Sequence, residues 1–146
     1  MTAIVSSGEG HLLGARGNVM AFKAVAAQTG GDFSLMERIV PASARMPLAH
    51  RHENCSEAFF VLDGVLTFVV DGQSLEGSAG DFLLVPRGVG HTFGNKSSAE
   101  ARLLVLHAPA MDAYFEELYL LWTSPDGPPA PDAERELMSR YGMEPA

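Results

Sequence analysis

The chain has 146 residues, of which 47% are hydrophobic, which is enough for one domain with a substantial buried core. Ten basic residues against eighteen acidic ones give a formal charge of −8, and no basic cluster is long enough to make a phosphate-binding face, so we expect no nucleic-acid partner. No apolar run approaches membrane-spanning length, and residues 1–10 lack a basic region followed by an apolar core, which predicts a cytoplasmic protein with no membrane partner.

The first forty residues predict strands and loops. Residues 1–7 are mostly apolar, which suits either an edge strand or an arm onto a partner subunit. Residues 8–17 are rich in glycine and predict a loop, with His11 as a solvated loop residue rather than a ligand. Residues 18–26 and 32–40 have β-type sequences, and the Thr-Gly-Gly sequence between them predicts a hairpin.

The next stretch contains residues that can ligate a metal ion. Side chains alternate along a β-strand, so His50 and His52 project to the same side and their ring nitrogens can reach one ion. Glu57 lies five residues past His52, far enough for the chain to turn and return on a neighbouring strand. Cys55 is the only cysteine, so no intrachain disulfide can form, and we expect it to be a small packing residue.

A strand, a turn and a second strand follow. Two apolar runs flank the Asp-Gly sequence at residues 63–64, whose turn chemistry predicts a tight hairpin. If Glu57 points inward, parity places Phe59 and Val61 on the same inner face, where they either line a cavity or pack in an ordinary core. The outer face is also apolar, which predicts contact with a second sheet or a second subunit.

Residues 80–95 supply a third imidazole. An apolar strand enters a Pro/Gly turn, and a histidine opens the next strand. Phe93 shares a face with this histidine by parity and is a candidate for the cavity wall. Three nitrogens and one oxygen thus become available for one divalent metal ion, and the four candidate ligands are His50, His52, Glu57 and His91.

The last third of the chain changes from a strand pattern to a helix pattern. Residues 101–107 alternate and predict the strand that closes the barrel. His107 either enters the cavity as a proton donor or acceptor or, in the favoured interpretation, has a surface or hydrogen-bonded structural role. Beyond it an apolar stripe predicts a helix capped by Asp112, and residues 132–141 predict a short helix ended by Gly142. These helices cover either the cavity mouth or only a sheet edge.

Two interlocking motifs in this sequence resemble those of the cupin family. The first is Gly, five residues, His-x-His, three or four residues, Glu, six residues and Gly, and it is matched by His50, His52, Glu57 and Gly64. The second is Gly, five residues, Pro-x-Gly, two residues, His, three residues and Asn, and it is matched by Gly80, Pro86, Gly88, His91 and Asn95. Ala44 stands where the first motif opens with glycine, at a position that holds no ligand.

The resemblance implies more about the fold than the strand pattern does. Periodicity alone predicts an all-β sandwich or barrel, whereas the resemblance implies an all-β double-stranded β-helix, the cupin jelly-roll barrel, with six to ten antiparallel strands and two short C-terminal helices. It also implies a single cupin domain over residues 1–146, with the barrel core at about residues 18–108 and a helical extension at about residues 110–146. Small cupins commonly form dimers, so we expect a homodimer.

The predicted ligands indicate a transition metal site but do not identify the metal. Three imidazoles and one carboxylate do not select strongly among Fe, Mn, Co, Ni, Cu and Zn, so the expected cofactor is one divalent transition metal ion. Residues 52–64 and 83–88 are similar to small quercetin dioxygenase-like bacterial cupins. This similarity implies a dioxygenase that acts on a flavonol-like, enolisable aromatic small molecule, with Glu57 as both a metal ligand and the catalytic residue that removes the substrate proton.

Two other hypotheses stay open. One is non-redox catalysis, in which the ion polarises a carbonyl for isomerisation, cyclisation, dehydration or decarboxylation of a polyketide-like or keto-acid substrate. The other is a barrel that binds a small molecule without catalysis. Full turnover by the zinc form without oxygen would favour the first, and ligand affinity that survives Glu57→Gln would favour the second.

Overall fold

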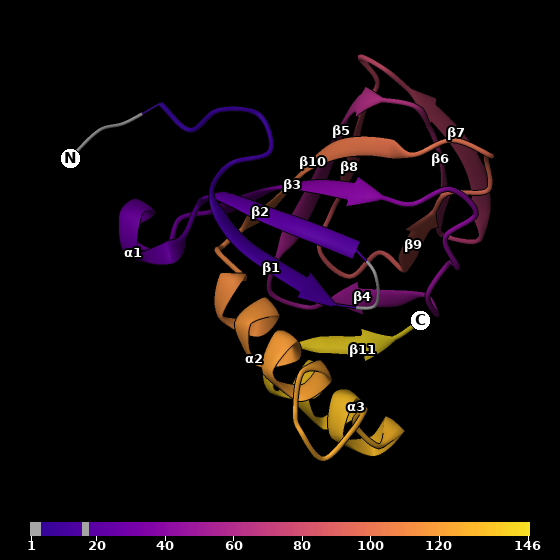
Figure 1. Ribbon diagram of the computed structural model, residues 1–146. Coiled ribbons are helices and arrows are strands. Elements are labelled where there is room, and N and C mark those ends of the chain that lie inside the picture. The colour runs from indigo at the N-terminus through magenta and orange to yellow at the C-terminus, as the bar shows by residue number, and fades with distance from the viewer. Residues whose placement is uncertain (1–3, 16–17) are drawn as a thin grey trace.

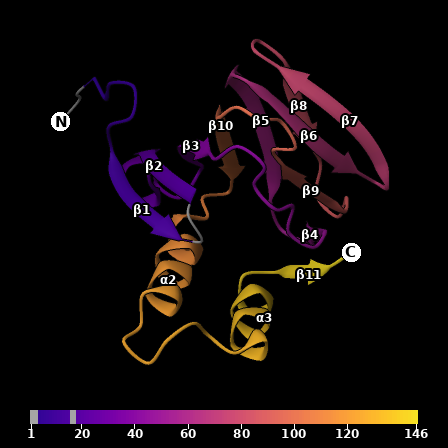
Figure 2. The same cartoon turned by 45° about the vertical axis from the view of Figure 1, so that its right-hand side comes forward.

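The computed structural model describes residues 4–15 and 18–146, which form two antiparallel β-sheets with the two C-terminal helices together at one end (Figure 1 and Figure 2). The first sheet has six strands, in the order β1 (His11–Ala15), β2 (Asn18–Ala24), β3 (Ser34–Val40), β10 (Ala101–Ala108), β5 (Ser56–Asp63) and β8 (Phe82–Val85). The second has five, in the order β11 (Met143–Pro145), β4 (His50–His52), β9 (His91–Gly94), β6 (Val65–Val70) and β7 (Gln73–Ser78). The helices are α1 (Ala26–Thr29), α2 (Asp112–Trp122) and α3 (Pro131–Arg140). The predicted all-β double-stranded β-helix is confirmed, and the predictions for residues 1–3 and 16–17 lie outside the described residues.

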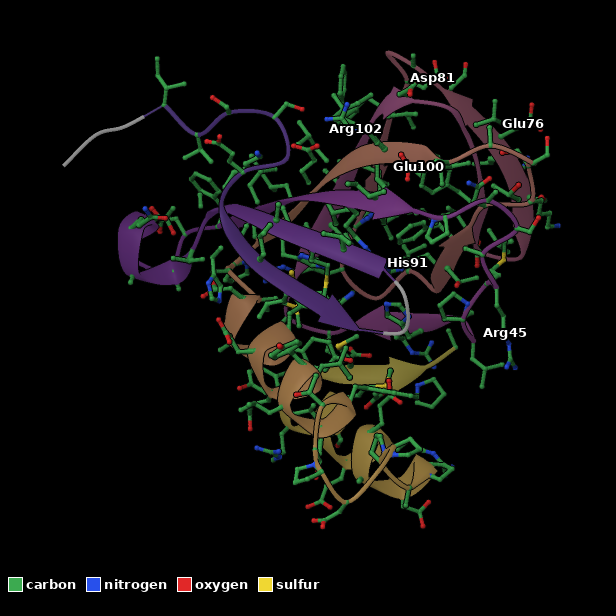
Figure 3. The ribbon with its side chains drawn as sticks, viewed as in Figure 1. Arg45, Glu76, Asp81, His91, Glu100 and Arg102 are labelled. Carbon is green, nitrogen blue, oxygen red and sulfur yellow. The ribbon has the colours of Figure 1, made fainter. Side chains whose placement is uncertain are left out.

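The space between the sheets is filled according to strand alternation. On β10 every second residue is buried, ending with His107. The inward residues of β5 are Glu57, Phe59 and Val61, as parity predicted. Charged side chains such as those of Glu76 and Asp81 project from the outside of the barrel, whereas His91 lies within it (Figure 3). The barrel interior is therefore apolar except for a polar cluster.

Residues 11–15 were predicted to belong to a loop, and that prediction was wrong, because they form strand β1. His11 of β1 pairs with Phe22 of β2, and the antiparallel register continues to the end of the strand. The pairing satisfies the backbone groups of β2, which would otherwise be an edge strand, and it buries Leu13 in the core. The His11 side chain is half-exposed and contacts Glu116 of α2.

Strands β2 and β3 pair antiparallel, as predicted, but not through a tight turn. The chain between them forms the short helix α1, which ends at Gly30 with a left-handed φ of 66°. Asp112 was predicted to cap its own helix, but its Oδ1 instead accepts a hydrogen bond from the backbone N–H of Ala26, at 2.9 Å. Because this carboxylate serves α1, helix α2 begins without a side-chain cap.

The Asp-Gly sequence before β6 does not form the predicted hairpin. Strands β5 and β6 belong to different sheets, and the chain crosses between the sheets at Gly64, with a φ of 81°. A Cβ atom at Gly64 would lie 2.8 Å from the Cα atom of Ala101 and 2.8 Å from the carbonyl oxygen of Glu100, so only glycine fits the crossing. A two-residue hairpin occurs at residues 71–72, between β6 and β7.

The C-terminal segment packs against one end of the barrel. Helix α2 contacts β1 and buries Tyr114 and Leu118, and α3 is followed by Gly142 with a φ of 72°, where the sequence predicted the helix to end. The chain then forms β11, which the sequence did not predict, and Met143 pairs with His52 of β4. The strands of the described ranges therefore number eleven, one more than the predicted upper limit. A helix able to span a membrane is absent from the described part of the chain.

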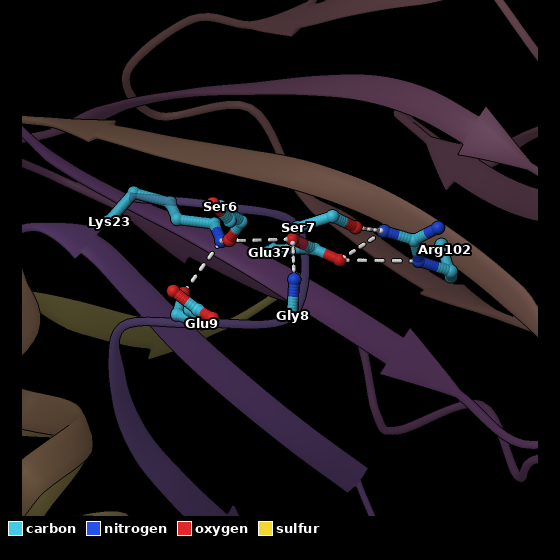
Figure 4. A network of polar contacts seen from close by, with 7 residues as sticks. All are labelled: Ser6, Ser7, Gly8, Glu9, Lys23, Glu37 and Arg102. Atoms are coloured by element: carbon cyan, nitrogen blue, oxygen red, sulfur yellow. Dashed lines mark hydrogen bonds and ion pairs between the residues drawn. The ribbon is translucent and has the colours of Figure 1, made fainter. Parts of the chain in front are cut away.

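A buried carboxylate, Glu37 of β3, ties the N-terminal segment to the first sheet (Figure 4). It accepts a hydrogen bond from the backbone N–H of Gly8 at 2.9 Å, and its Oε1 lies 3.1 Å from Nζ of Lys23. Its Oε2 accepts a hydrogen bond from Nε of Arg102 at 3.2 Å. Lys23 and Arg102 also donate to oxygens of residues 6–9, so the two cations join the segment to the strands.

Candidate metal centre

Four side chains from three strands converge inside the barrel. His50 and His52 both come from β4, with Arg51 between them pointing the other way, as strand alternation predicts. Glu57 reaches the same point from β5 of the facing sheet, and His91 of β9 pairs directly with His50. One ligand atom from each of His50, His52, Glu57 and His91 lies within 4.8 Å of the others. The structure thus brings together all four predicted ligands.

The Glu57 carboxylate is the centre of this cluster. Its Oε1 atom lies 2.7 Å from Nε2 of His91 and 3.0 Å from Nε2 of His52. Nδ1 of His91 lies 3.0 Å from the carbonyl oxygen of Val89. In the neutral tautomer with the proton on Nδ1, this nitrogen donates a hydrogen bond to the carbonyl oxygen, and Nε2 keeps a lone pair that can bind a metal ion. This is the orientation in which a carbonyl partner holds a metal-binding histidine.

The surroundings of His52 test whether these residues suit a metal ion. His52 is 3% exposed; its Nδ1 atom makes no hydrogen bond among the described residues, and its Nε2 atom lies 3.0 Å from Oε1 of Glu57 without the geometry of a hydrogen bond. A buried polar atom without a partner costs about 1–3 kcal/mol. An ion coordinated by Nε2 would satisfy this atom, and the same ion would neutralise the adjacent Glu57 carboxylate. Imidazole nitrogens and carboxylate oxygens are both common ligands of divalent transition metals. The residues therefore fit a divalent transition metal ion.

Burial and the neighbouring imidazoles set the charges of the cluster. Burial raises the pKa of Glu57, but His107, His52 and His91 outweigh it and hold the pKa of this carboxyl well below its usual value. Burial, assisted by His91, lowers the pKa of His50 to about 4. For His91, burial lowers the pKa, but the Glu57 carboxylate overrides it and raises the pKa. At neutral pH the cluster thus contains an ionised carboxylate and a neutral His50, both ready to donate lone pairs.

His107 is a fourth imidazole at the same carboxylate. It lies opposite Glu57 in the register of β10 and β5, and its Nε2 is 3.2 Å from Oε2 of Glu57. Its side chain is 2% exposed and lines the cavity, so of the two roles favoured from the sequence, surface or hydrogen-bonded structural, the surface role was wrong. Strand parity places His107 on the same face as Leu103 and Val105, but the sequence gives no register between β10 and β5.

A cavity of about 860 Å³ opens onto the cluster. Both C-terminal helices line it, so they cover the cavity rather than only a sheet edge. Phe93 and His107 are part of its wall, as proposed from the sequence. The apolar side chains of the wall include Met20, Met36, Phe93, Phe115, Leu118 and Trp122. Such a wall suits an apolar or aromatic molecule.

For Phe59 and Val61 the sequence left cavity lining and core packing open, and the structure shows core packing. Both are 1% exposed and point inward, but they belong to the hydrophobic core and not to the cavity lining. The rings of Phe59, Phe68 and Phe93 pack against one another, with centroid distances of 5.2, 5.3 and 5.9 Å, and of the three only Phe93 lines the cavity. Strand alternation correctly predicted that both side chains point inward, but only the packing of the core shows that they do not reach the cavity.

Sequence reasoning missed Arg38 of β3 as a cavity residue. It lines the cavity, and its guanidinium carbon lies 5.1 Å from the centroid of the Phe93 ring. The signal was available, because Arg38 has the same strand parity as the buried Met36 and Val40.

Cys55 is buried outside the ligand group, as predicted, and burial raises the pKa of its thiol to about 11.

Comparison with known proteins identifies related sequences and folds. A sequence family described as "Cupin domain" matches residues 36–107. Quercetin 2,3-dioxygenase from Bacillus subtilis (strain 168) is 30% identical over 115 residues, which cover 79% of this chain and 34% of that protein. The chain therefore corresponds to about a third of the length of this relative.

Two solved structures show the same fold. The structure of KdgF from Halomonas sp. has a TM-score of 0.66 and 17% identity, and the match covers 77% of this chain and 98% of that chain. The polyketide cyclase RemF from Streptomyces resistomycificus has a TM-score of 0.63 and 23% identity, with 74% of this chain and 80% of that chain covered. At these identities the likeness concerns the fold.

Proposed function

Because the chain belongs to the cupin superfamily, we propose that it is a metal-dependent enzyme whose metal ligands are His50, His52, Glu57 and His91. The observation that carries the proposal is the cluster itself, in which four ligand atoms lie within 4.8 Å of one another at the end of a cavity of about 860 Å³. A small-molecule substrate fits a cavity of this volume.

The proposed reaction is the dioxygenation of an enolisable aromatic compound of the flavonol type. The similarity to quercetin 2,3-dioxygenase supports this choice, and so do the aromatic residues of the cavity wall. A divalent iron, manganese, nickel, cobalt or copper ion, when bound, supplies the Lewis-acidic and redox-active centre that such a reaction requires. A zinc ion would supply only the Lewis acid.

The side chains of the cavity perform the remaining tasks. Glu57 accepts the proton of the substrate enol at a carboxylate oxygen, because it is ionised and faces the cavity. His107 lies against Oε2 of the same carboxylate and orients it. Phe93 and Phe115 form apolar walls that hold an aromatic ring and exclude water from it. Each of these roles follows from a contact or a position in the cavity.

Oxygen uptake tests the proposal. The protein is stripped with a chelator, reloaded with each candidate metal and assayed with quercetin and other enolisable aromatics. We expect uptake with at least one of the iron, manganese, nickel and cobalt forms, and loss of uptake in Glu57→Gln but not in Glu76→Gln, which changes an exposed carboxylate. No uptake with any metal would defeat the dioxygenase proposal. Turnover of the zinc form under strict anaerobiosis would point instead to non-redox catalysis.

We also propose that the protein is a homodimer formed through the outer face of the first sheet. Three apolar side chains on β5 and β8 lie together there, since Phe60 pairs with Phe82 and Ala58 pairs with Leu84. Phe60, Phe82 and Leu84 are 40%, 64% and 54% exposed. A contiguous apolar patch on a sheet face is typical of a surface that packs against a second subunit.

A further inference from the structure

Arg38 brings a positive charge into the cavity from the middle of a sheet. It lies on β3, between Met20 of β2 and Leu103 of β10 in the strand register, and both of these neighbours are buried. Its strand parity is that of the buried Met36 and Val40, so its side chain points to the inside of the barrel and lines the cavity. Arginine is seldom placed on the inner face of a sheet, because removing its charge from water is costly.

The Arg38 guanidinium lies over an aromatic ring. Its central carbon lies 5.1 Å from the centroid of Phe93, within the range of a cation–π interaction. Phe93 is packed in turn against Phe59 and Phe68, so the ring is a rigid support. The planar guanidinium matches the geometry of a carboxylate, to which it can donate two parallel hydrogen bonds.

The charge of the cavity differs from that of the whole chain. The chain has a formal charge of −8, whereas the cavity lining contains three arginines and two glutamates, Glu57 and Glu134. One of these glutamates, Glu57, is surrounded by imidazoles. Arg45 is exposed, and the side chain of Arg135 is 64% exposed, whereas Arg38 is half-buried. Arg38 is thus the least exposed of the three arginines that line the cavity.

We propose that Arg38 binds the carboxylate of an aromatic acid substrate whose opposite end reaches the metal cluster. His91 and Phe93 are two residues apart on β9 and share a face, so the cluster and the ring supporting Arg38 are separated by about 7 Å along the strand. A hydroxylated aromatic ring with a short acidic side chain spans this distance. The inference rests on the proposed function, since it uses the same cavity, and it narrows the substrate class from enolisable aromatics to those that carry a carboxylate.

Binding of a charged probe and its uncharged counterpart tests the proposal. 4-Hydroxycinnamate and 4-hydroxycinnamamide have the same shape and differ in the carboxylate. Titration calorimetry measures the affinity of each for the full chain, both dialysed against EDTA and loaded with zinc. Trp122, the only tryptophan, lines the cavity, so quenching of its fluorescence reports that the probe is bound there. We expect the acid to bind roughly 10- to 100-fold more tightly than the amide.

Variants assign this preference to one side chain. We expect Arg38→Gln to bind the acid and the amide equally, and Arg38→Lys to keep part of the preference because it keeps the charge but not the planar fork. Arg45→Gln and Arg135→Gln are matched controls, because they remove an exposed arginine of the same cavity, and they should keep the preference. Circular dichroism checks that each variant is folded. If a variant does not fold, the comparison of acid with amide in the unmodified protein still tests the proposal.

Three outcomes would overturn the inference: no saturable binding of the acid, equal affinity for acid and amide in the unmodified protein, or an acid preference that survives in folded Arg38→Gln. Failure of the proposed function would look different. A protein that binds no metal, yet prefers the acid in its EDTA-dialysed form, would refute the metal enzyme and support the role of Arg38. A protein that oxidises neutral flavonols without any preference for acids would support the metal enzyme and refute the role of Arg38.

Discussion

His107 lies directly opposite Glu57 in the pairing of β10 with β5, and its Nε2 atom is 3.2 Å from Oε2 of the carboxylate. The other carboxylate oxygen, Oε1, faces His52 and His91. The two oxygens of Glu57 thus have different partners. We therefore expect His107 to fix the rotation of the carboxylate and so to determine which oxygen is presented to the proposed metal site.

Replacing His107 should weaken metal binding without removing a predicted ligand. His107→Phe keeps an aromatic ring but loses the contact with Glu57, and we expect the affinity for a divalent metal to fall by about 10- to 100-fold. His107→Gln retains a donor and should lose less. Competition with a chromophoric chelator measures the affinity. His11→Phe, which changes an exposed histidine, is the control. An unchanged affinity in His107→Phe would refute the orienting role.

Glu37 should make stability depend on pH in the acid range. Burial raises the pKa of its carboxyl, but the Gly8 N–H, Arg102 and Lys23 outweigh it and lower the pKa from 4.5 to about 2. The folded state therefore binds a proton less readily than the unfolded chain. The stabilisation is complete above pH 4.5 and is lost as the pH falls through about 2.

Denaturant unfolding of Glu37→Gln checks this expectation. At pH 7 the variant should be less stable by up to about 3 kcal/mol, which is the free energy equivalent to the pKa shift. The difference from the unmodified protein should shrink steadily between pH 4.5 and pH 2. The exposed Glu76→Gln should show almost no difference at any pH. A difference for Glu37→Gln that does not change with pH would contradict the ion network as its cause.

Two glycines with similar backbone angles should respond differently to alanine. Gly64 and Gly72 have φ values of 81° and 77°, so alanine is strained at both and costs about 1 kcal/mol there. At Gly64 the new Cβ would also lie 2.8 Å from backbone atoms of Glu100 and Ala101, whereas at Gly72 it meets nothing within 4 Å. Gly64→Ala should therefore lose about 1–3 kcal/mol more than Gly72→Ala in equilibrium unfolding. Equal losses would mean that the sheet crossing is not tightly packed.

An acidic residue on the outer sheet face should dissociate the proposed dimer. We expect the unmodified protein to have the mass of a dimer in light scattering after gel filtration, and Phe82→Asp to have that of a monomer, because a charge buried at an apolar interface is costly. Leu120→Asp is a matched control, since Leu120 on α2 is 64% exposed, as is Phe82. A monomeric unmodified protein, or a dimer that persists in Phe82→Asp, would rule out this face.

Much of the candidate site was predictable because its signals are local. The single residue between His50 and His52 directs both rings to one face of β4, and the spacing of Glu57 and His91 matches two known motifs. The inward face of β5 and the alternation of β10 followed from the same two-residue period. Where the structure departed from expectation, the signal was not local. Gly64 has the sequence of a hairpin turn, yet its neighbours at Ala101 and Glu100 are more than thirty positions away.

The sequence by itself determined which side chains point inward and which of them can bind a metal, because the direction of a side chain on a strand depends only on its position within that strand. The tertiary structure alone decided that His107 meets Glu57, that Arg38 lies over Phe93, and that the C-terminal helices line the cavity. These contacts depend on the register between strands and on the packing of helices against the barrel. Both are set by the burial of apolar surface across the whole molecule, which no short segment encodes.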